Sequence, residues 1–347
     1  MPLKMLSRKS AAISARLIMS VYLLKRSEII DNQWDDFIII SPQSIFYANS
    51  WYLDVVSPDW CALVMEENGR WQAVMPLPVR EKWFMKVIKQ PFFCQLLGVF
   101  AVSEATFQEA TLLFLQKLPD YFRYVSIYSG RFFELFPSLP NYALTHCSID
   151  ILLLDLPYTT LKANFSADRK KNLKRANKFH WHIETSQDIN PLIELFQANH
   201  ADKIEGGVAE SAYDLLRRVF EVLKDKKSGR LMYAIKDGKI EAGALFAIAN
   251  KRIIYLFNAA SPLGRQGDAR TLLIDWMIQQ YANSDYVFDF ESPEIASIKD
   301  FYQSFGTKKE DYQSLHLNKL PFPLKQIQQR RRKLSESFKL SESSSES

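Results

Sequence analysis

The sequence contains few glycines and cysteines and no long hydrophobic run. Only 11 of its 347 residues are Gly, whereas 24 are Phe, 15 Tyr and 7 Trp. This composition, with 47% hydrophobic residues, excludes a fibrous or largely disordered protein and provides material for a large core. The three cysteines, Cys61, Cys94 and Cys147, are odd in number and widely spaced, so we expect no disulfide framework and no metal site. A reducing compartment suits such a chain.

No apolar run approaches the roughly 18 residues that span a bilayer, and the longest candidate, Pro91–Val102, is interrupted by Gln95. The basic N-terminus lacks the apolar core of a secretory signal. We interpret residues 1–20 as a disordered extension, with a transit peptide or an over-long start as alternatives. Residues 325–347 are rich in Ser and Glu and predict a disordered tail. We therefore expect a soluble, cytoplasmic protein without a transmembrane segment.

Acidic residues are scarce at both ends of the chain. Residues 1–26 carry six basic residues and no acid, and residues 325–347 carry six basic and three acidic residues. The remaining residues hold 32 bases against 36 acids, which argues against a broad nucleic-acid-binding face. The exception is residues 162–178, where seven Lys and Arg accompany the single acid Asp168. This segment predicts contact with tRNA, a nucleotide-linked substrate or a phospholipid surface, or else a solvated helix face.

Two passages of the chain follow a similar order of elements. Asn68-Gly69 and Asp237-Gly238 each separate two strand-like runs, and these dipeptides suit type I′ hairpin turns because both central residues need positive φ. After the first hairpin, Ser103–Leu118 predicts a helix and Tyr121–Tyr128 a strand. The repeat predicts an α/β (α+β) fold with mixed sheets, built from two related halves at residues 21–148 and 149–324.

The second half contains a glycine-containing loop between a strand and a helix. We expect these elements in order: strand Arg252–Ala260, loop Ser261–Arg270, helix Asp268–Tyr281, strand Tyr286–Phe290, helix Ile295–Phe305 and strand Tyr312–Leu317. The first helical N–H groups have no internal partner and the dipole is positive there, so this loop predicts an anion site. Gly267 would let a phosphate approach the backbone, and Arg265 and Arg270 add charge. An ordinary strand-to-helix loop is the alternative.

This order of elements resembles the GNAT acyltransferase fold. The matching residues are Gly267-x-Ala269 in the loop and Ala296, Phe301-Tyr302 and Phe305-Gly306 in the helix that follows. The usual first member of the loop pattern is missing, because Gly264 stands in its place. The resemblance implies a coenzyme A thioester as the donor substrate and no metal. The residues that would hold the donor are Phe257, Asn258, Arg265, Gln266, Gly267, Asp268, Ala269 and Arg270.

Tandem GNAT-like halves also resemble the Fem-type (FemABX-like) peptidoglycan aminoacyltransferases, over about residues 40–316. The matching stretches are Trp71–Val79, Pro91–Gly98, Ser166–Lys178, Tyr255–Ala260, Trp276, Asp289 and Phe301–Gly306. This resemblance implies an amine acceptor, either a small molecule or a cell-wall precursor, and aminoacyl-tRNA contact through the basic helix 169–178. Two departures favour thioester-using relatives. No long helical arm is present, and the family's Phe-Lys pair reads Phe301-Tyr302.

Acyl transfer to an amine requires a base, a polarised carbonyl and a protonated leaving group. Asp289 and Glu291 are the candidate bases, because residues two apart share one face of a strand. Alternatively, Asp289 caps the following loop. His200 is a further candidate base. The GNAT resemblance implies that Tyr302 protonates the departing thiolate, although an amphipathic helix residue is equally consistent. A backbone N–H near Leu256–Asn258 is expected to polarise the carbonyl.

The sequence thus predicts an N-acyltransferase that moves an acyl group from acyl-CoA to an amine by direct attack. The first half lacks the Gly-x-Ala loop, so we expect it to be non-catalytic and to shape an acceptor pocket between the halves. One alternative is a Fem-type enzyme that uses aminoacyl-tRNA and modifies a cell-wall precursor. The other is a catalytically inactive GNAT-fold binding protein.

Overall fold

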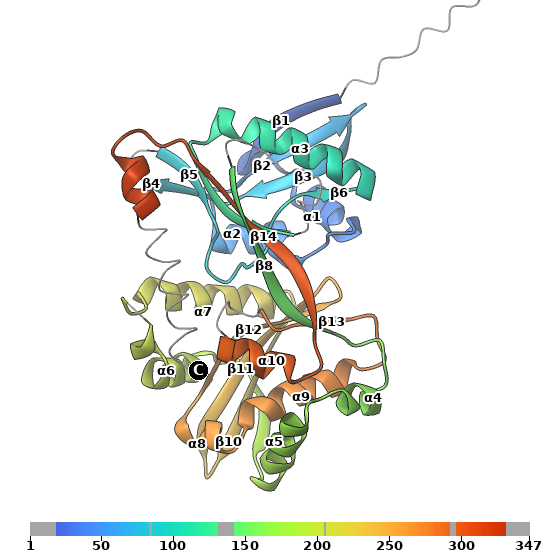
Figure 1. Cartoon of the computed structure of the whole chain (residues 1–347), viewed down its shortest axis with the longest axis vertical. Coiled ribbons are helices and arrows are strands. Elements are labelled where there is room, and N and C mark those ends of the chain that lie inside the picture. The colour runs from blue at the N-terminus through green and yellow to red at the C-terminus, as the bar shows by residue number, and fades with distance from the viewer. Residues whose placement is uncertain (1–18, 83–84, 131–141, 205, 292–295, 331–347) are drawn as a thin grey trace, which may run out of the picture.

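The computed structural model describes residues 19–82, 85–130, 142–204, 206–291 and 296–330 (Figure 1). The described strands form a four-stranded sheet, β1-β2-β3-β6, and a ten-stranded sheet, β4-β5-β7-β14-β8-β13-β12-β11-β10-β9. The strands are β1 Met19–Lys25, β2 Cys61–Glu67, β3 Arg70–Leu77, β4 Val79–Lys82, β5 Met85–Lys89, β6 Phe100–Ala101, β7 Tyr124–Ser129, β8 Tyr142–Leu153, β9 His182–Ser186, β10 Gly229–Lys236, β11 Lys239–Ala249, β12 Arg252–Ala260, β13 Val287–Asp289 and β14 Lys308–Asn318.

Helices cover the sheets on both halves of the molecule (Figure 1). The α-helices are α1 Asp31–Ile40, α2 Ser50–Val56, α3 Glu104–Tyr121, α4 Tyr158–Ala163, α5 Ala167–Lys178, α6 Asn190–Asn199, α7 Glu210–Asp225, α8 Pro262–Gln266, α9 Ala269–Tyr281 and α10 Ala296–Gln303. Short 3₁₀ turns are η1 Arg26–Glu28, η2 Phe46–Ala48 and η3 Ala201–Lys203. The predicted α/β class with mixed sheets is confirmed.

Both predicted hairpins are present, and their turns have the expected backbone. Asn68 and Gly69 have φ of 50° and 77°, and Asp237 and Gly238 have φ of 49° and 74°. These positive values match the type I′ geometry that joins strands of right-handed twist. The turns connect β2 to β3 and β10 to β11, which pair antiparallel.

The two halves share one sheet, because two long strands cross between them (Figure 1). β14 lies between β7 and β8: Leu317 is opposite Val125 of β7, and Lys308 is opposite Ile151 of β8. β8 also pairs with β13, so hydrogen bonding continues from one half into the other. The boundary expected at residues 148 and 149 therefore falls inside β8, and the last strand completes the sheet of the first half.

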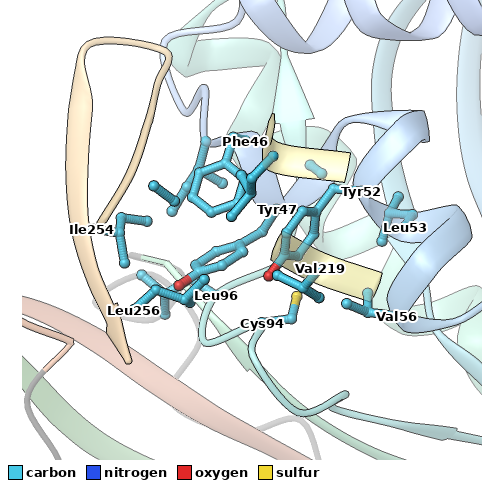
Figure 2. Close-up of a cluster of buried hydrophobic side chains, with 14 of the residues drawn as sticks. Phe46, Tyr47, Tyr52, Leu53, Val56, Cys94, Leu96, Val219, Ile254 and Leu256 are labelled. Atoms are coloured by element: carbon cyan, nitrogen blue, oxygen red, sulfur yellow. The ribbon is translucent and has the colours of Figure 1, made fainter. Parts of the chain in front are cut away.

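A hydrophobic cluster fills the space between the halves (Figure 2). Phe46, Tyr47 and Tyr52 of the first half pack in the same cluster as Ile254 and Leu256 of β12. A second cluster lies under α9 in the C-terminal half, and a third lies under α3. The interface between the halves is thus built like a protein core, which fixes their relative position.

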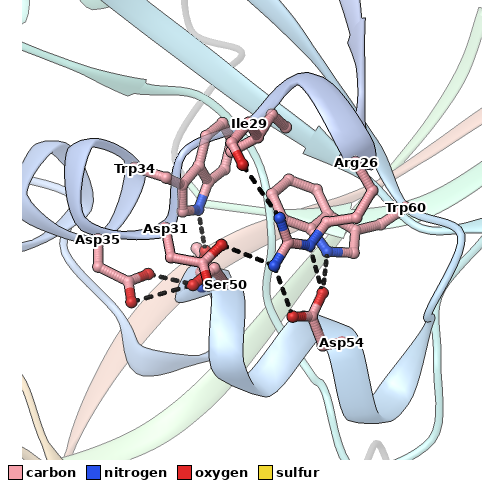
Figure 3. A network of polar contacts seen from close by, with 9 residues as sticks. Arg26, Ile29, Asp31, Trp34, Asp35, Ser50, Asp54 and Trp60 are labelled. Carbon is pink, nitrogen blue, oxygen red and sulfur yellow. Dashed lines mark hydrogen bonds and ion pairs between the residues drawn. The ribbon is translucent and has the colours of Figure 1, made fainter.

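The segment that carries Tyr47 is anchored by a polar network (Figure 3). The Arg26 guanidinium donates to Asp54 at 2.6 and 2.7 Å and to Asp31 at 2.7 Å. Trp60 Nε1 also donates to Asp54, at 2.8 Å. Bidentate pairing of this kind is geometrically specific, so it ties η1, α1 and α2 together around the turn η2.

The ends of the described chain differ from the sequence expectation. β1 begins at Met19, and residues 1–18 lie outside the described part. Residues 324–330 are helical, and Gln328 Nε2 donates to the Tyr124 hydroxyl at 2.9 Å. The expected tail therefore starts with an ordered segment, and residues 331–347 are not described. Within the described ranges, no helix has the length and apolarity needed to cross a bilayer.

Candidate active site

Strands β12 and β13 run parallel, and the whole of the short β13 pairs with the beginning of β12. The pairs are Arg252 with Val287, Ile253 with Phe288 and Ile254 with Asp289. β13 ends at Asp289 whereas β12 continues to Ala260, so in the described chain this edge of β12 has no strand partner beyond Ile254.

A bulge in β12 changes which way its side chains point. Leu245 of β11 pairs with Phe257 and the next residue pairs with Tyr255, so Leu256 is an extra residue in β12. Before the bulge, Ile254 packs toward the first half while Tyr255 packs under α9. After it, the Asn258 side chain contacts Arg270 of α9. Bulges commonly re-aim side chains next to active sites.

Glu291 lies at the carboxyl end of β13, facing the first half. Its Oε1 accepts a hydrogen bond of 2.7 Å from the Tyr47 hydroxyl, and its backbone N–H donates to Asp289 Oδ1 at 2.8 Å. Burial raises the pKa of Glu291 to about 8, the hydrogen bond from Tyr47 opposes this, and the Asp289 charge adds to it. Glu291 has φ of 49°, an uncommon conformation for a non-glycine residue that recurs at functional sites. A half-buried carboxyl that titrates near neutrality suits a general base.

Asp289 is buried in an ion pair and lies on the same side of the sheet. Its Oδ2 is 2.6 Å from Arg252 Nη1, and Arg252 also pairs with Glu310 at 2.8 Å. Burial raises the pKa of Asp289 while the Arg252 charge lowers it. Only 1% of the Asp289 surface is exposed, so this carboxylate supports the Glu291 backbone and has little access to a substrate.

Tyr302 of α10 lies on the other face, with Asn258 and Arg270. Arg270 Nη1 donates to Asn258 Oδ1 at 3.1 Å. Burial raises the pKa of Tyr302 to about 12, and the Glu291 charge also raises it. The Arg270 charge and a hydrogen bond with Asn258 lower this pKa. The phenol therefore stays protonated at neutral pH and can donate to a ligand atom.

Sequence reasoning missed two tyrosines near this point. Tyr47 contacts Glu291, and the buried Tyr255 hydroxyl has no hydrogen-bond partner within the described residues. The Tyr255 ring packs against Tyr302, with centroids 6.1 Å apart. Nothing in the sequence pattern separates either residue from the many aromatic core positions around it.

The loop expected at Ser261–Arg270 contains a helix, α8, that the sequence did not predict. Ser261 caps it, because its hydroxyl accepts from the Gly264 N–H at 3.0 Å, and Pro262 occupies the first turn. A Cβ added to Gly264 would lie 2.0 Å from the Glu241 carbonyl oxygen. Gly264 is therefore required by the close packing of α8 on β11, which explains its place in the pattern.

Gly267 is covered by aromatic side chains, contrary to the open loop that the sequence predicts. A Cβ there would lie 2.4 Å from the Trp181 ring. The Gly267 carbonyl accepts from Trp181 Nε1 at 2.9 Å, and its N–H donates to Leu263 at 2.9 Å. Both polar backbone groups are thus occupied, so the expected approach of a phosphate to Gly267 is corrected to a packing role.

Four of the other expected donor-binding residues lie in the loop and separate into two groups. Asp268 and Ala269 turn inward: the Asp268 carboxylate is 2.5 Å from Arg175 Nε, and Ala269 is fully buried. Arg265 and Gln266 lie exposed on the surface, where Arg265 also donates to the Ala260 carbonyl at 2.7 Å.

Two of the expected donor-binding residues, Asn258 and Arg270, lie with Tyr302 beside β12. Phe257 follows the bulge and packs between two rings, at 4.8 Å from Phe196 and 6.2 Å from Phe93. It lines the side toward the first half.

The basic helix α5 is only partly available to an anionic partner. Arg169 is 4% exposed, donates to Ser304 at 2.8 Å and to Thr271 at 2.5 Å, and stacks 4.1 Å over the Phe301 ring. It links α5 to α9 and α10, which removes it from the expected tRNA contact. The exposed bases of the helix are Lys171, Lys174, Arg175 and Lys178.

The remaining candidates have structural surroundings. His200 Nε2 is 3.1 Å from the Ala260 carbonyl oxygen and 3.2 Å from its nitrogen, at the end of β12. Cys61 and Cys94 are buried, Cys147 is half-buried, and all three are free. Burial raises the pKa of Cys61 to about 12, which disfavours the reactive thiolate.

A cavity of about 430 Å³ is lined mainly by residues of the first half, and neither Asp289 nor Glu291 is among its lining residues. Its lining includes Ser44, Ile45, Leu96 and Gly98 of the first half with Arg252 and Glu310 of the second. Leu96 lies beside Tyr47 (Figure 2), and Arg252 connects the cavity to Asp289.

Comparisons with known proteins agree with this architecture. Residues 162–303 match the family model described as an acetyltransferase (GNAT) domain, a segment that includes β12, β13 and α10 up to Tyr302. The C-terminal half thus contains a segment that matches a GNAT acetyltransferase domain, which indicates an acyltransferase. No curated protein matches the chain in sequence.

Two solved structures share the fold over most of the chain. FemX aligns with a TM-score of 0.60 and 13% identity, covering 86% of this chain and 98% of that chain. A conserved protein of unknown function from Bacteroides thetaiotaomicron VPI-5482 aligns with a TM-score of 0.54 and 12% identity, covering 84% and 98%. The predicted resemblance to Fem-like proteins with tandem GNAT-like halves is confirmed at the level of the fold.

Proposed function

We propose that this chain is an N-acyltransferase that moves an acyl group from a coenzyme A thioester to an amine by direct attack. The observation that carries the proposal is the position of two titratable groups, Glu291 and Tyr302, near the carboxyl end of β13. The Glu291 carboxyl faces the first half, and the Tyr302 hydroxyl lies on the side of α9 and α10. The ring of Phe290, the residue before Glu291, lies 4.9 Å from the Tyr302 ring, measured between centroids.

Each group has a chemical role in this proposal. Glu291 takes the proton of the amine whose nitrogen attacks the thioester carbon, so the C–N bond forms as the C–S bond breaks. Tyr302 donates its hydrogen bond to the departing sulfur. Asn258 lies beside Tyr302, and its side-chain N–H donors would stabilise charge that develops on the carbonyl oxygen.

The donor is proposed to lie on the side of α9. Because Gly267 is covered, the groups left for the charged end of the donor are Arg265, Arg270 and the N–H groups in the first turn of α9. The acceptor is proposed to enter from the 430 Å³ cavity between the halves. Its amine would come from a small molecule or a cell-wall precursor.

A thermal shift experiment tests donor binding. Coenzyme A binding to the folded state should raise the melting temperature by mass action. At a coenzyme A concentration of 100 times Kd, binding adds about 2.7 kcal/mol to the free energy of unfolding. We expect this shift to shrink in Arg270→Ala and to persist in Arg217→Ala, a surface control remote from the site. Acylation of an amine panel by acyl-CoA, detected by mass spectrometry, then tests turnover. A chain that binds no coenzyme A and acylates nothing would contradict the proposal.

Aminoacyl-tRNA is the second candidate donor, favoured by the FemX-like fold and by the exposed lysines of α5. A melting-temperature shift caused by aminoacyl-tRNA, together with none caused by millimolar coenzyme A, would select it. Its affinity should fall as salt rises, because lysine contacts release counterions. The third candidate is an inactive binding protein, which the covered Gly267 favours. Turnover of any acyl donor would exclude this candidate.

A further inference from the structure

A tyrosine of the first half completes the site of the second half. Tyr47, in the turn η2, donates a hydrogen bond of 2.7 Å to Oε1 of Glu291, 244 positions away in the chain. We propose that Tyr47 is a positioning residue that holds the Glu291 carboxylate toward the acceptor side, so that neither half alone has a complete base. This inference rests on the proposed role of Glu291 as the base.

The Tyr47 ring is held rigidly. Only 1% of its surface is exposed, and its centroid lies 4.5 Å from Phe46 and 5.6 Å from Tyr52. Next to it, the Ala48 carbonyl accepts a 2.7 Å hydrogen bond from Trp34 Nε1. The hydroxyl lies beside the apolar side chains of Leu96 and Leu256 (Figure 2). A packed ring with one polar contact fixes that contact in place.

Glu291 depends on such a contact. Its backbone is fixed by Asp289, but β13 ends before it and its φ of 49° is sterically costly. Among the described residues, the titratable groups that act on it electrostatically are Tyr47, Tyr52, Cys94, Asp289 and Tyr302. Asp289 is already paired with Arg252, and the other four are neutral at pH 7. The hydroxyl of Tyr47 is therefore the donor that favours the ionised carboxylate, as a hydrogen bond to a charged acceptor does.

Titration of the Glu291 carboxyl tests this contact without any need for turnover. The side-chain carboxyl signal is followed against pH by NMR of carbon-13-labelled glutamate and assigned with Glu291→Gln. In Tyr47→Phe the titration should move upward by about one pH unit, since a hydrogen bond to a charged group is lost. Tyr52→Phe is the matched control: it is fully buried in the same cluster, and its hydroxyl donates to the Phe93 carbonyl. We expect no movement there.

The pH profile of turnover tests whether the contact matters for the reaction. In Tyr47→Phe the acid limb of kcat/KM should move to higher pH together with the titration of Glu291. The value of kcat/KM should be about tenfold lower than in wild type below the midpoint and equal to wild type above it. An unmoved titration overturns the inference, and so does a moved titration with an unmoved limb. If wild type acylates no amine, the proposed function fails instead, and the titration still decides the contact. Melting curves of both variants show whether either has unfolded.

Discussion

The indole of Trp181 occupies the space where Gly267 would carry a Cβ, and its Nε1 donates a 2.9 Å hydrogen bond to the Gly267 carbonyl. The residue that most resembles a phosphate-binding glycine is thus a packing glycine. The donor has to be held by groups around it, and this relationship makes the first prediction.

Gly267→Ala should destabilise the fold, because the new methyl would lie 2.4 Å from Trp181 and 2.7 Å from Phe179. Overpacking of this kind costs about 1–3 kcal/mol, which urea denaturation measures. Gly130→Ala is the matched control, since a Cβ there meets nothing within 4 Å. Equal stability of the two variants would show that Trp181 does not cover Gly267.

Tyr302→Phe should slow acyl transfer by about 10²-fold or more, the range of a positioned acid, while the fold persists. The comparison is Tyr255→Phe, because that hydroxyl is equally buried but has no partner in the described chain. We expect Tyr255→Phe to keep its turnover and to lose no stability. Single-turnover rates with a saturating thioester provide the measurement, and an unchanged rate in Tyr302→Phe would remove Tyr302 from the mechanism.

Stability should depend on the ionisation of Glu291. Its pKa is about 8 in the folded state, against 4.5 ordinarily, so the folded protein binds a proton more tightly than the unfolded chain. Wild type should therefore lose stability as pH rises from about 4.5 to about 8. Glu291→Gln, which cannot ionise, should lack this loss. Denaturation curves at pH 5 and pH 9 measure the difference, and parallel pH dependence in both proteins would contradict the raised pKa.

Arg252→Ala should be strongly destabilising, because it leaves the buried Asp289 carboxylate without its partner. Breaking a buried pair from one side costs about 3–5 kcal/mol. Arg217→Ala removes an exposed arginine that pairs with Asp214 at 2.8 Å and should cost less than about 1 kcal/mol. A similar loss in the two variants, measured by chemical denaturation, would show that Asp289 is hydrated.

Local elements were predictable from the sequence because their causes are local. The hairpins follow from Asn68-Gly69 and Asp237-Gly238, and the strand Arg252–Ala260 has its predicted bounds. The helix α8 was not predictable, since Gly264 has poor helix propensity and the packing on Glu241 that requires it is tertiary.

Long-range pairings could not be predicted. The insertion of β14 beside β7 depends on strand register, and the contact between Tyr47 and Glu291 joins residues 244 positions apart. The candidate base Glu291 came from the alternation of side chains along a strand and the acid Tyr302 from the family motif, but their neighbours came only from the fold. Likewise, a basic helix pattern gives no sign that Arg169 is buried.

The most direct test of the central claim is the pH dependence of kcat/KM for amine acylation by an acyl-CoA, in wild type and Glu291→Gln. The wild-type rate should rise with pH and level off above about 8, as the carboxyl loses its proton. Glu291→Gln should be slower by about 10²-fold or more and lack that limb. A variant that keeps both the wild-type rate and the wild-type limb would contradict the assignment of Glu291 as the base.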